Sequence, residues 1–306
     1  MKYSSSGVAF VLIMLFSSCI YSQVQSSATP DSLQIFEKYI GALNPNDIST
    51  IDKSASRFRQ LFEKSSVLTK DTAFIAFWRY YVTVADSLGG RYVQYEKYNS
   101  FINIKDFDEP SPKNEKLKQT LLSRNKSLNE NDFKILKKIN KYGYKFDMIE
   151  GVLLVSVADP KFILNNFSGF ISQGLKLYIT KVIEEIDTAG NPDVETTTSP
   201  DELVKRLLWW ENFINNNQDF FLIDDCFSTY DGYLYTIMLG TDYNPAFNSA
   251  DQKLNKKFKK AYEKIINNHK DTRAAAIIKE YYNILKKNNF TNNKEAAKYA
   301  GQFLGE

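Results

Sequence analysis

Few residues in this 306-residue chain have the chemistry of a catalyst. The single histidine, His269, lies in the polar segment Asn267–Asp271, which favours a solvated loop between helices over a nucleophile–base pair. The two cysteines, Cys19 and Cys226, are too few for a zinc site of the His/Cys type, and Cys226 stands among apolar residues, as a core residue does. Glycine-rich phosphate-binding motifs do not occur in the sequence. We therefore expect no cofactor and no metal ion.

Paired carboxylates are the remaining source of catalysis, because glycoside cleavage needs only two acids. Glu150 and Glu211 stand among apolar or aromatic residues, where burial raises the pKa of a carboxyl group. The adjacent pairs Glu184–Glu185 and Asp224–Asp225 point to different faces of a helix. A buried glutamate is at least as often a structural acid with its hydrogen bonds satisfied. A carboxylate-dependent glycan hydrolase is therefore the alternative to a non-enzymatic function.

Aromatic residues make up 14% of the chain and are dense between residues 209 and 235. They cannot all lie on one buried stripe, so either these helices are buried on all sides or some rings line a groove. A groove of rigid aromatic faces binds sugars and peptides well. The candidate ligand-binding residues are Trp209, Trp210, Tyr230 and Tyr233. The expected partner is an envelope protein, a peptide or a glycan.

The charge pattern argues against nucleic acid as a partner. The formal net charge is +3, whereas a nucleic-acid-binding protein carries a concentrated basic face. The lysines of residues 253–264 surround Leu254, Phe258 and Ala261, which is the pattern of an amphipathic helix with a solvated polar face.

Residues 1–22 have the features of a bacterial export signal. Lys2 precedes an apolar stretch at residues 8–16 (VAFVLIMLF), too short to span a bilayer, and a Ser/Gln-rich linker follows at residues 23–30. Two cleavage sites fit. Cys19 after Phe16-Ser17-Ser18 resembles a lipoprotein box with Cys19 lipidated, and Ile20-Tyr21-Ser22 resembles an ordinary signal-peptidase site. We expect an exported protein, either periplasmic or lipid-anchored in the outer membrane, with no other membrane attachment.

Residues 31–306 are predicted to form a mainly α body, an irregular helical bundle or an α-solenoid-like array. Helix starts are marked by Thr29-Pro30-Asp31 and Ser199-Pro200-Asp201-Glu202, and an aromatic helix is expected from Asp71 to Gly89-Gly90. A small β-hairpin is predicted near residues 145–157, where β-branched residues surround Gly151. Pro110 and Pro112 mark a loop at 99–112 that divides the body if it has two lobes.

Two stretches resemble uncharacterised helical extracytoplasmic proteins and lipoproteins of bacteria. They are residues 142–146 (YGYKF) with Glu150-Gly151, and residues 210–214 (WENFI) followed by Gly240 and residues 244–247 (NPAF). The signal region also resembles those of the Bacteroidetes group. The resemblance implies a helical body behind a signal peptide and brings no known activity. We therefore expect a non-enzymatic binding or scaffolding module.

Overall fold

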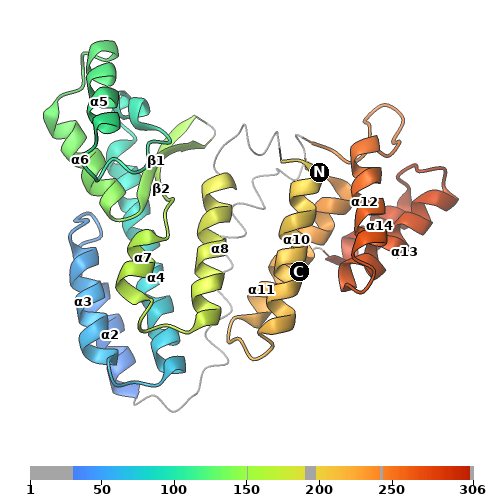
Figure 1. The fold of residues 1–306 in the computed structure, drawn as a ribbon, viewed down its shortest axis with the longest axis horizontal. Helices are drawn as coiled ribbons and strands as arrows, with labels where there is room; N and C mark the ends of the chain where they lie inside the picture. Colours follow the sequence, from blue (N-terminus) through green and yellow to red (C-terminus); the bar gives the residue numbers. More distant parts are fainter. Residues whose placement is uncertain (1–29, 150, 190–197, 242–243, 304–306) are drawn as a thin grey trace. The chain divides into compact units, whose positions relative to one another are not determined.

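The computed structural model of the chain describes residues 30–149, 151–189, 198–241 and 244–303. Within them the fold is mainly α with one antiparallel two-stranded sheet, which confirms the predicted fold class (Figure 1). Glu150 and residues 1–29, which hold the predicted export signal with Cys19 and all of the predicted linker except Pro30, lie outside the described residues. The described residues fall into two compact units, residues 30–189 (the N-terminal unit) and residues 198–303 (the C-terminal unit). No helix among them is long and apolar enough to cross a membrane.

The N-terminal unit packs helices around a long central helix and a β-hairpin. Its elements, in chain order, are α2 (Pro30–Gly41), α3 (Thr50–Phe62), α4 (Val67–Tyr92), the 3₁₀ helix η2 (Glu96–Phe101), α5 (Pro112–Arg124), α6 (Glu130–Lys141), β1 (Tyr144–Ile149), β2 (Val152–Val157), α7 (Lys161–Phe167) and α8 (Gln173–Ala189).

Helix α4 differs from its predicted extent at both ends. It begins at Val67, after Ser66, whose hydroxyl accepts a hydrogen bond from the Thr69 N–H, and not at Asp71. It also continues through Gly89 and Gly90 instead of ending there. A Cβ atom on Gly89 would lie 3.2 Å from the Val155 nitrogen, so the missing side chain lets α4 approach β2 closely. Gly89 therefore serves packing, and neither glycine marks the end of the helix.

The hairpin lies where the sequence predicts it. Strands β1 and β2 are antiparallel, from Tyr144 opposite Val157 to Ile149 opposite Val152, and Gly151 in the turn has a φ of 81° that favours glycine. The hairpin also holds a buried charged group: the Lys145 ammonium lies 3.0 Å from the Asp147 carboxylate. The ion pair is satisfied locally, as burial of charge requires.

The chain does not divide at residues 99–112, where two lobes were expected to separate. The two units are divided between residues 189 and 198, and residues 99–112 lie inside the N-terminal unit. Phe101 and Phe107 are buried there, and the Asn140 side chain accepts a hydrogen bond from the Phe107 N–H and donates one to the Ile104 carbonyl. The prolines interrupt helix formation in this segment, but its side chains remain anchored in one core.

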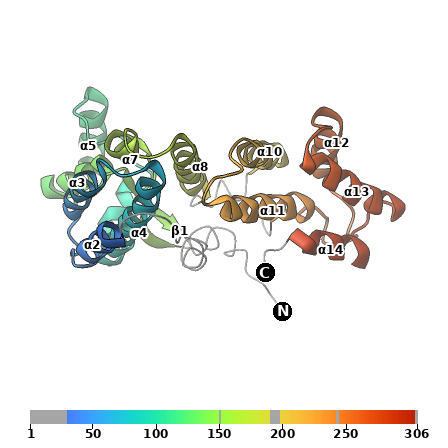
Figure 2. The same cartoon turned by 90° about the horizontal axis from the view of Figure 1, so that it is seen from below.

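The C-terminal unit is helical throughout its described elements. They are α10 (Pro200–Asn216), α11 (Ile223–Leu239), α12 (Lys256–Asn268), α13 (Arg273–Lys287), α14 (Lys294–Ala300) and the 3₁₀ helix η3 (Gly301–Phe303). As predicted, α10 begins with Pro200 after the Ser199 cap, whose hydroxyl accepts a hydrogen bond from the Glu202 N–H. Helices α10 and α11 form a helical hairpin, and α12 to α14 pack beside them (Figures 1 and 2).

Buried tyrosines join the C-terminal helices. The Tyr262 and Tyr281 hydroxyls of α12 and α13 both donate to the Met238 carbonyl near the end of α11, at 2.8 and 3.2 Å. Burial raises the pKa of both tyrosine hydroxyls above the usual range, so both stay neutral and can donate a hydrogen bond. Helices α11, α12 and α13 are thus joined through a single backbone carbonyl group.

Candidate functional site

The candidate site of the C-terminal unit lies where α10, α11 and the start of α13 meet. Glu211, in the middle of α10, is buried, with 6% of its surface exposed. Its carboxylate accepts hydrogen bonds from the Arg273 N–H at 2.6 Å and the Ala274 N–H at 3.0 Å. It also accepts one from the Tyr230 hydroxyl at 3.2 Å. One buried acid therefore holds three helices together.

These bonds complete the N-terminus of α13. The first N–H groups of a helix have no partner inside the helix and carry partial positive charge. In α13 the first two bond to Glu211, and the third, that of Ala275, bonds to the Thr272 hydroxyl at 3.1 Å. The carboxylate charge of Glu211 is thus compensated by backbone dipoles, so this acid is structural.

Beside Glu211 the surface encloses a pocket of about 400 Å³, a size within the range of small-molecule sites. We call it the Glu211 pocket. Its wall is made of apolar and aromatic side chains with two amides and one guanidinium. The lining residues are Glu211, Ile214, Asn215, Gln218, Ile223, Phe227, Tyr230 and Arg273.

The Arg273 guanidinium is held over two aromatic rings at this pocket. Its central carbon lies 5.7 Å from the centre of the Phe227 ring and 5.2 Å from that of Tyr230, which are cation–π distances. The guanidinium faces the Asp231 carboxylate at 3.7 Å, a distance too long for a hydrogen bond. Burial raises the pKa of Asp231, and Arg273 opposes that rise. The guanidinium is oriented by rings and charge, with hydrogen-bond donors left for a ligand.

The aromatic candidates of the sequence are only partly brought together. Tyr230 lines the Glu211 pocket, where burial and the nearby Glu211 charge raise the pKa of its hydroxyl. Trp210 is fully buried, so the expectation of a ligand-binding ring is wrong for this residue. It packs edge-on against Trp209, at 5.0 Å between ring centres, and Trp209 stacks on Phe213. Trp209 and Tyr233 are half-buried and do not line this pocket.

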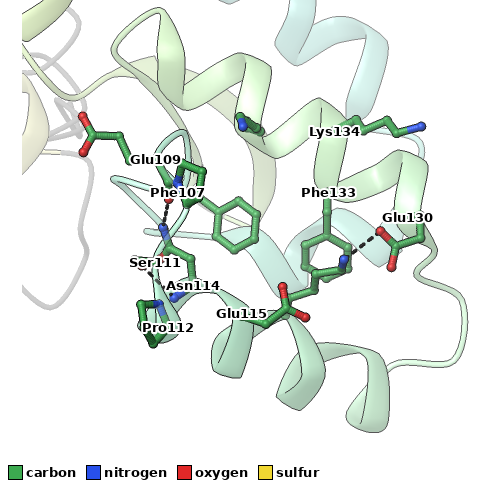
Figure 3. Close-up of a pocket in the computed structure, with 12 residues that line it drawn as sticks. Phe107, Glu109, Ser111, Pro112, Asn114, Glu115, Glu130, Phe133 and Lys134 are labelled. Carbon is green, nitrogen blue, oxygen red and sulfur yellow. Dashed lines mark hydrogen bonds and ion pairs between the residues drawn. The ribbon is translucent and has the colours of Figure 1, made fainter.

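A second pocket, of about 560 Å³, lies in the N-terminal unit between α5 and α6, and we call it the α5–α6 pocket. Phe107 and Phe133 form its floor (Figure 3). Lys118 of α5 pairs with Glu130 of α6 at 2.7 Å across it, and Glu109 at its edge pairs with Lys161 at 2.9 Å. Those ion pairs lower the pKa of Glu109 and raise that of Lys118. The polar rim therefore includes two ion pairs, of which Glu109–Lys161 is exposed and Lys118–Glu130 is partly exposed.

The other acids and potential nucleophiles that the sequence singled out do not line the Glu211 pocket. Cys226 is buried, and burial raises the pKa of its thiol, as expected of a core residue. His269 directly follows α12 and lies in the loop before α13, as predicted from the sequence. Glu185 is buried beside Lys181, 3.5 Å away. Among the described residues no group of three acidic, histidine or cysteine side chains is placed to hold a metal ion.

Arg273 and Phe227 are among the pocket residues that the sequence did not single out. Arg273 follows a Thr cap at a helix start, a local pattern that says nothing of Glu211, 62 residues earlier. Comparison of the chain with family models, with curated proteins and with solved structures finds no match.

Proposed function

We propose that this protein is an exported, non-enzymatic binding module, and that the Glu211 pocket is its ligand site. The observation that carries the proposal is the bonding of Glu211, the one carboxylate among the pocket-lining residues that the structure describes. Two backbone N–H groups and a tyrosine hydroxyl bond to it. A glycoside hydrolase needs a general acid and a second carboxylate within reach of the same bond. Glu211 instead fixes the shape of the pocket.

The test compares catalysis with binding in the same protein. We expect the purified mature chain to release no reducing ends from soluble peptidoglycan fragments or dietary polysaccharides, and Glu211→Gln to change nothing in that assay. A hydrolytic activity that disappears in Glu211→Gln would instead establish the carboxylate-dependent glycan hydrolase. Arg273→Gln is the matched binding variant, because it keeps the backbone N–H that bonds to Glu211.

Export and anchoring have a separate test. The apolar stretch at residues 8–16 and the linker behind it support export, and Cys19 supports a lipid anchor. We expect the protein in the envelope fraction of its host. Labelling with a fatty-acid precursor should mark the wild-type protein and not Cys19→Ala. An unlabelled wild-type protein in the periplasmic fraction would indicate ordinary signal cleavage.

A further inference from the structure

We propose that the Glu211 pocket binds one or two units of an uncharged saccharide. Phe227 is the packing face, and Arg273, Asn215 and Gln218 are the hydrogen-bonding groups. The inference rests on the proposed function, which makes this pocket the ligand site, and adds the chemical class of the ligand.

Phe227 is the first observation behind this class. Among the described residues of the C-terminal unit it is the one large apolar side chain that is exposed, with 37% of its surface in solvent. It lies at the pocket, where Arg273 covers part of the ring. An exposed aromatic ring beside polar groups suits a ligand with one apolar face and a polar edge. A pyranose ring has this form, since its C–H bonds gather on one face and its hydroxyls on the edge.

The polar lining is the second observation. Asn215 and Gln218 are exposed near the end of α10, and each amide carries both donors and acceptors. Arg273 adds guanidinium donors, which lie over two rings and 3.7 Å from the Asp231 carboxylate, beyond hydrogen-bond distance. Sugar hydroxyls both donate and accept, so they can satisfy amides and a guanidinium in the same pocket.

The charge balance favours an uncharged ligand over an acidic one. The Arg273 charge is flanked by Asp231, at 3.7 Å, and by Glu211, which bonds to the backbone of the same residue. A ligand carboxylate at this guanidinium would share it with the Asp231 carboxylate, and like charges at short range disfavour binding. Neutral hydroxyls use the same donors without that repulsion.

The form of the site also separates a saccharide from a peptide. Peptides are commonly bound along a sheet edge or in a long groove between helices. The described elements of the C-terminal unit are helices with isolated β-bridges, and the pocket is a compact space of about 400 Å³. A short saccharide fits this form better than an extended chain.

The test is isothermal titration calorimetry on the full mature chain with three probe sets. They are neutral disaccharides (cellobiose, maltose and N,N′-diacetylchitobiose), digalacturonic acid as the acidic counterpart, and trialanine as the peptide. We expect at least one neutral disaccharide to bind, and more tightly than digalacturonic acid. Phe227→Ala should weaken that binding by about tenfold or more. Phe227→Leu, which keeps an apolar side chain, serves with circular dichroism as the folding control.

Tyr95→Ala is the matched control, because Tyr95 is an exposed aromatic residue of the N-terminal unit, and it should leave binding unchanged. Tighter binding of digalacturonic acid, binding of trialanine alone, or no binding of any probe would overturn the saccharide inference. If the acidic or peptide probe binds and depends on Phe227, the binding function stands without the saccharide. Binding that is unaffected by Phe227→Ala and Arg273→Gln, or hydrolysis of the probe, would overturn the proposed function as well.

Discussion

The two pockets differ in how firmly their walls are held. The α5–α6 pocket is the larger, yet α5 has no buried residue, and the ion pair that crosses the pocket, Lys118–Glu130, is partly exposed. The Glu211 pocket is smaller, and a buried carboxylate bonded to two backbone N–H groups ties its helices together. A site binds well when its groups are already in place, because ordering them on binding costs free energy. The fixed geometry of its side chains therefore favours the Glu211 pocket as the ligand site.

The two pockets differ in this way because α5, a wall of the α5–α6 pocket, buries less of its surface than α10, a wall of the Glu211 pocket. The leucines of α5, Leu117, Leu121 and Leu122, are half-buried, whereas Leu136 of the neighbouring α6 is fully buried. In the C-terminal unit, α10 buries Leu207, Trp210 and Glu211 on the side that faces its neighbours. A helix gains most of its stability from packing one face, so α5 is the less firmly held wall.

The largest expected effect is unfolding at high pH. It tests whether the two units, whose pockets differ, both depend on buried tyrosines in their cores. Burial raises the pKa of Tyr81 and Tyr144 in the N-terminal unit and of Tyr262 in the C-terminal unit. Because the folded pKa is the higher one, their contribution is complete below the unfolded value near 10 and is lost as pH rises above it. Each such tyrosine should cost about 1.4 kcal/mol per pH unit above about pH 10. Far-ultraviolet circular dichroism during alkaline titration should show unfolding, and full helicity at pH of about 12 would contradict it.

Glu211→Ala should lower the free energy of unfolding of the C-terminal unit by about 3 kcal/mol, because it leaves two N–H groups and the Tyr230 hydroxyl without their charged acceptor. Urea denaturation followed by circular dichroism measures the change. The matched variant is Glu130→Ala at the α5–α6 pocket, where the glutamate is exposed, and it should have no measurable effect. Equal effects of the two variants would remove the distinction between the pockets.

Leu121→Ala tests how firmly α5 is held. Leu121 is half-buried, so its truncation should cost less than about 1 kcal/mol, whereas Leu136→Ala in α6 should cost about 3 kcal/mol through the cavity that it leaves. Native-state hydrogen exchange adds a direct measurement: the α5 amides should exchange faster than those of α6. Slow exchange in α5 would mean that its exposed contacts hold it as well as a core does.

The smallest effect concerns neighbouring glycines of α4. Gly90→Ala should stabilise the N-terminal unit by about 0.5 to 1 kcal/mol, because the new Cβ meets no atom and alanine favours the helix. Gly89→Ala should lose that gain, since its Cβ would lie 3.2 Å from the Val155 nitrogen of β2. Thermal unfolding of the two variants side by side gives the difference. A stabilisation of equal size in both would show that β2 yields to the added methyl group.

Local features of the fold follow from the sequence because their causes lie within a few residues. The Ser199-Pro200 start of α10, the hairpin turn at Gly151 and the core position of Cys226 are predicted from a cap, a backbone preference and an apolar neighbourhood. Local patterns gave wrong predictions at Gly89-Gly90, where a helix end was expected, and at Pro110 and Pro112, where a boundary between lobes was expected. There the packing of α4 on β2 and the anchoring of Phe107 outweigh the usual meaning of glycine and proline.

The sequence identified only some residues of the candidate site. Glu211 and Tyr230 attract notice by their neighbours, and by itself the sequence determines that one is an acid in an apolar setting and the other an aromatic ring. Tertiary structure decided that Glu211 caps α13, that Trp210 is buried, and that Arg273 and Phe227 complete the pocket. Those contacts join residues up to 63 positions apart, and they depend on how whole helices pack, which no local pattern encodes.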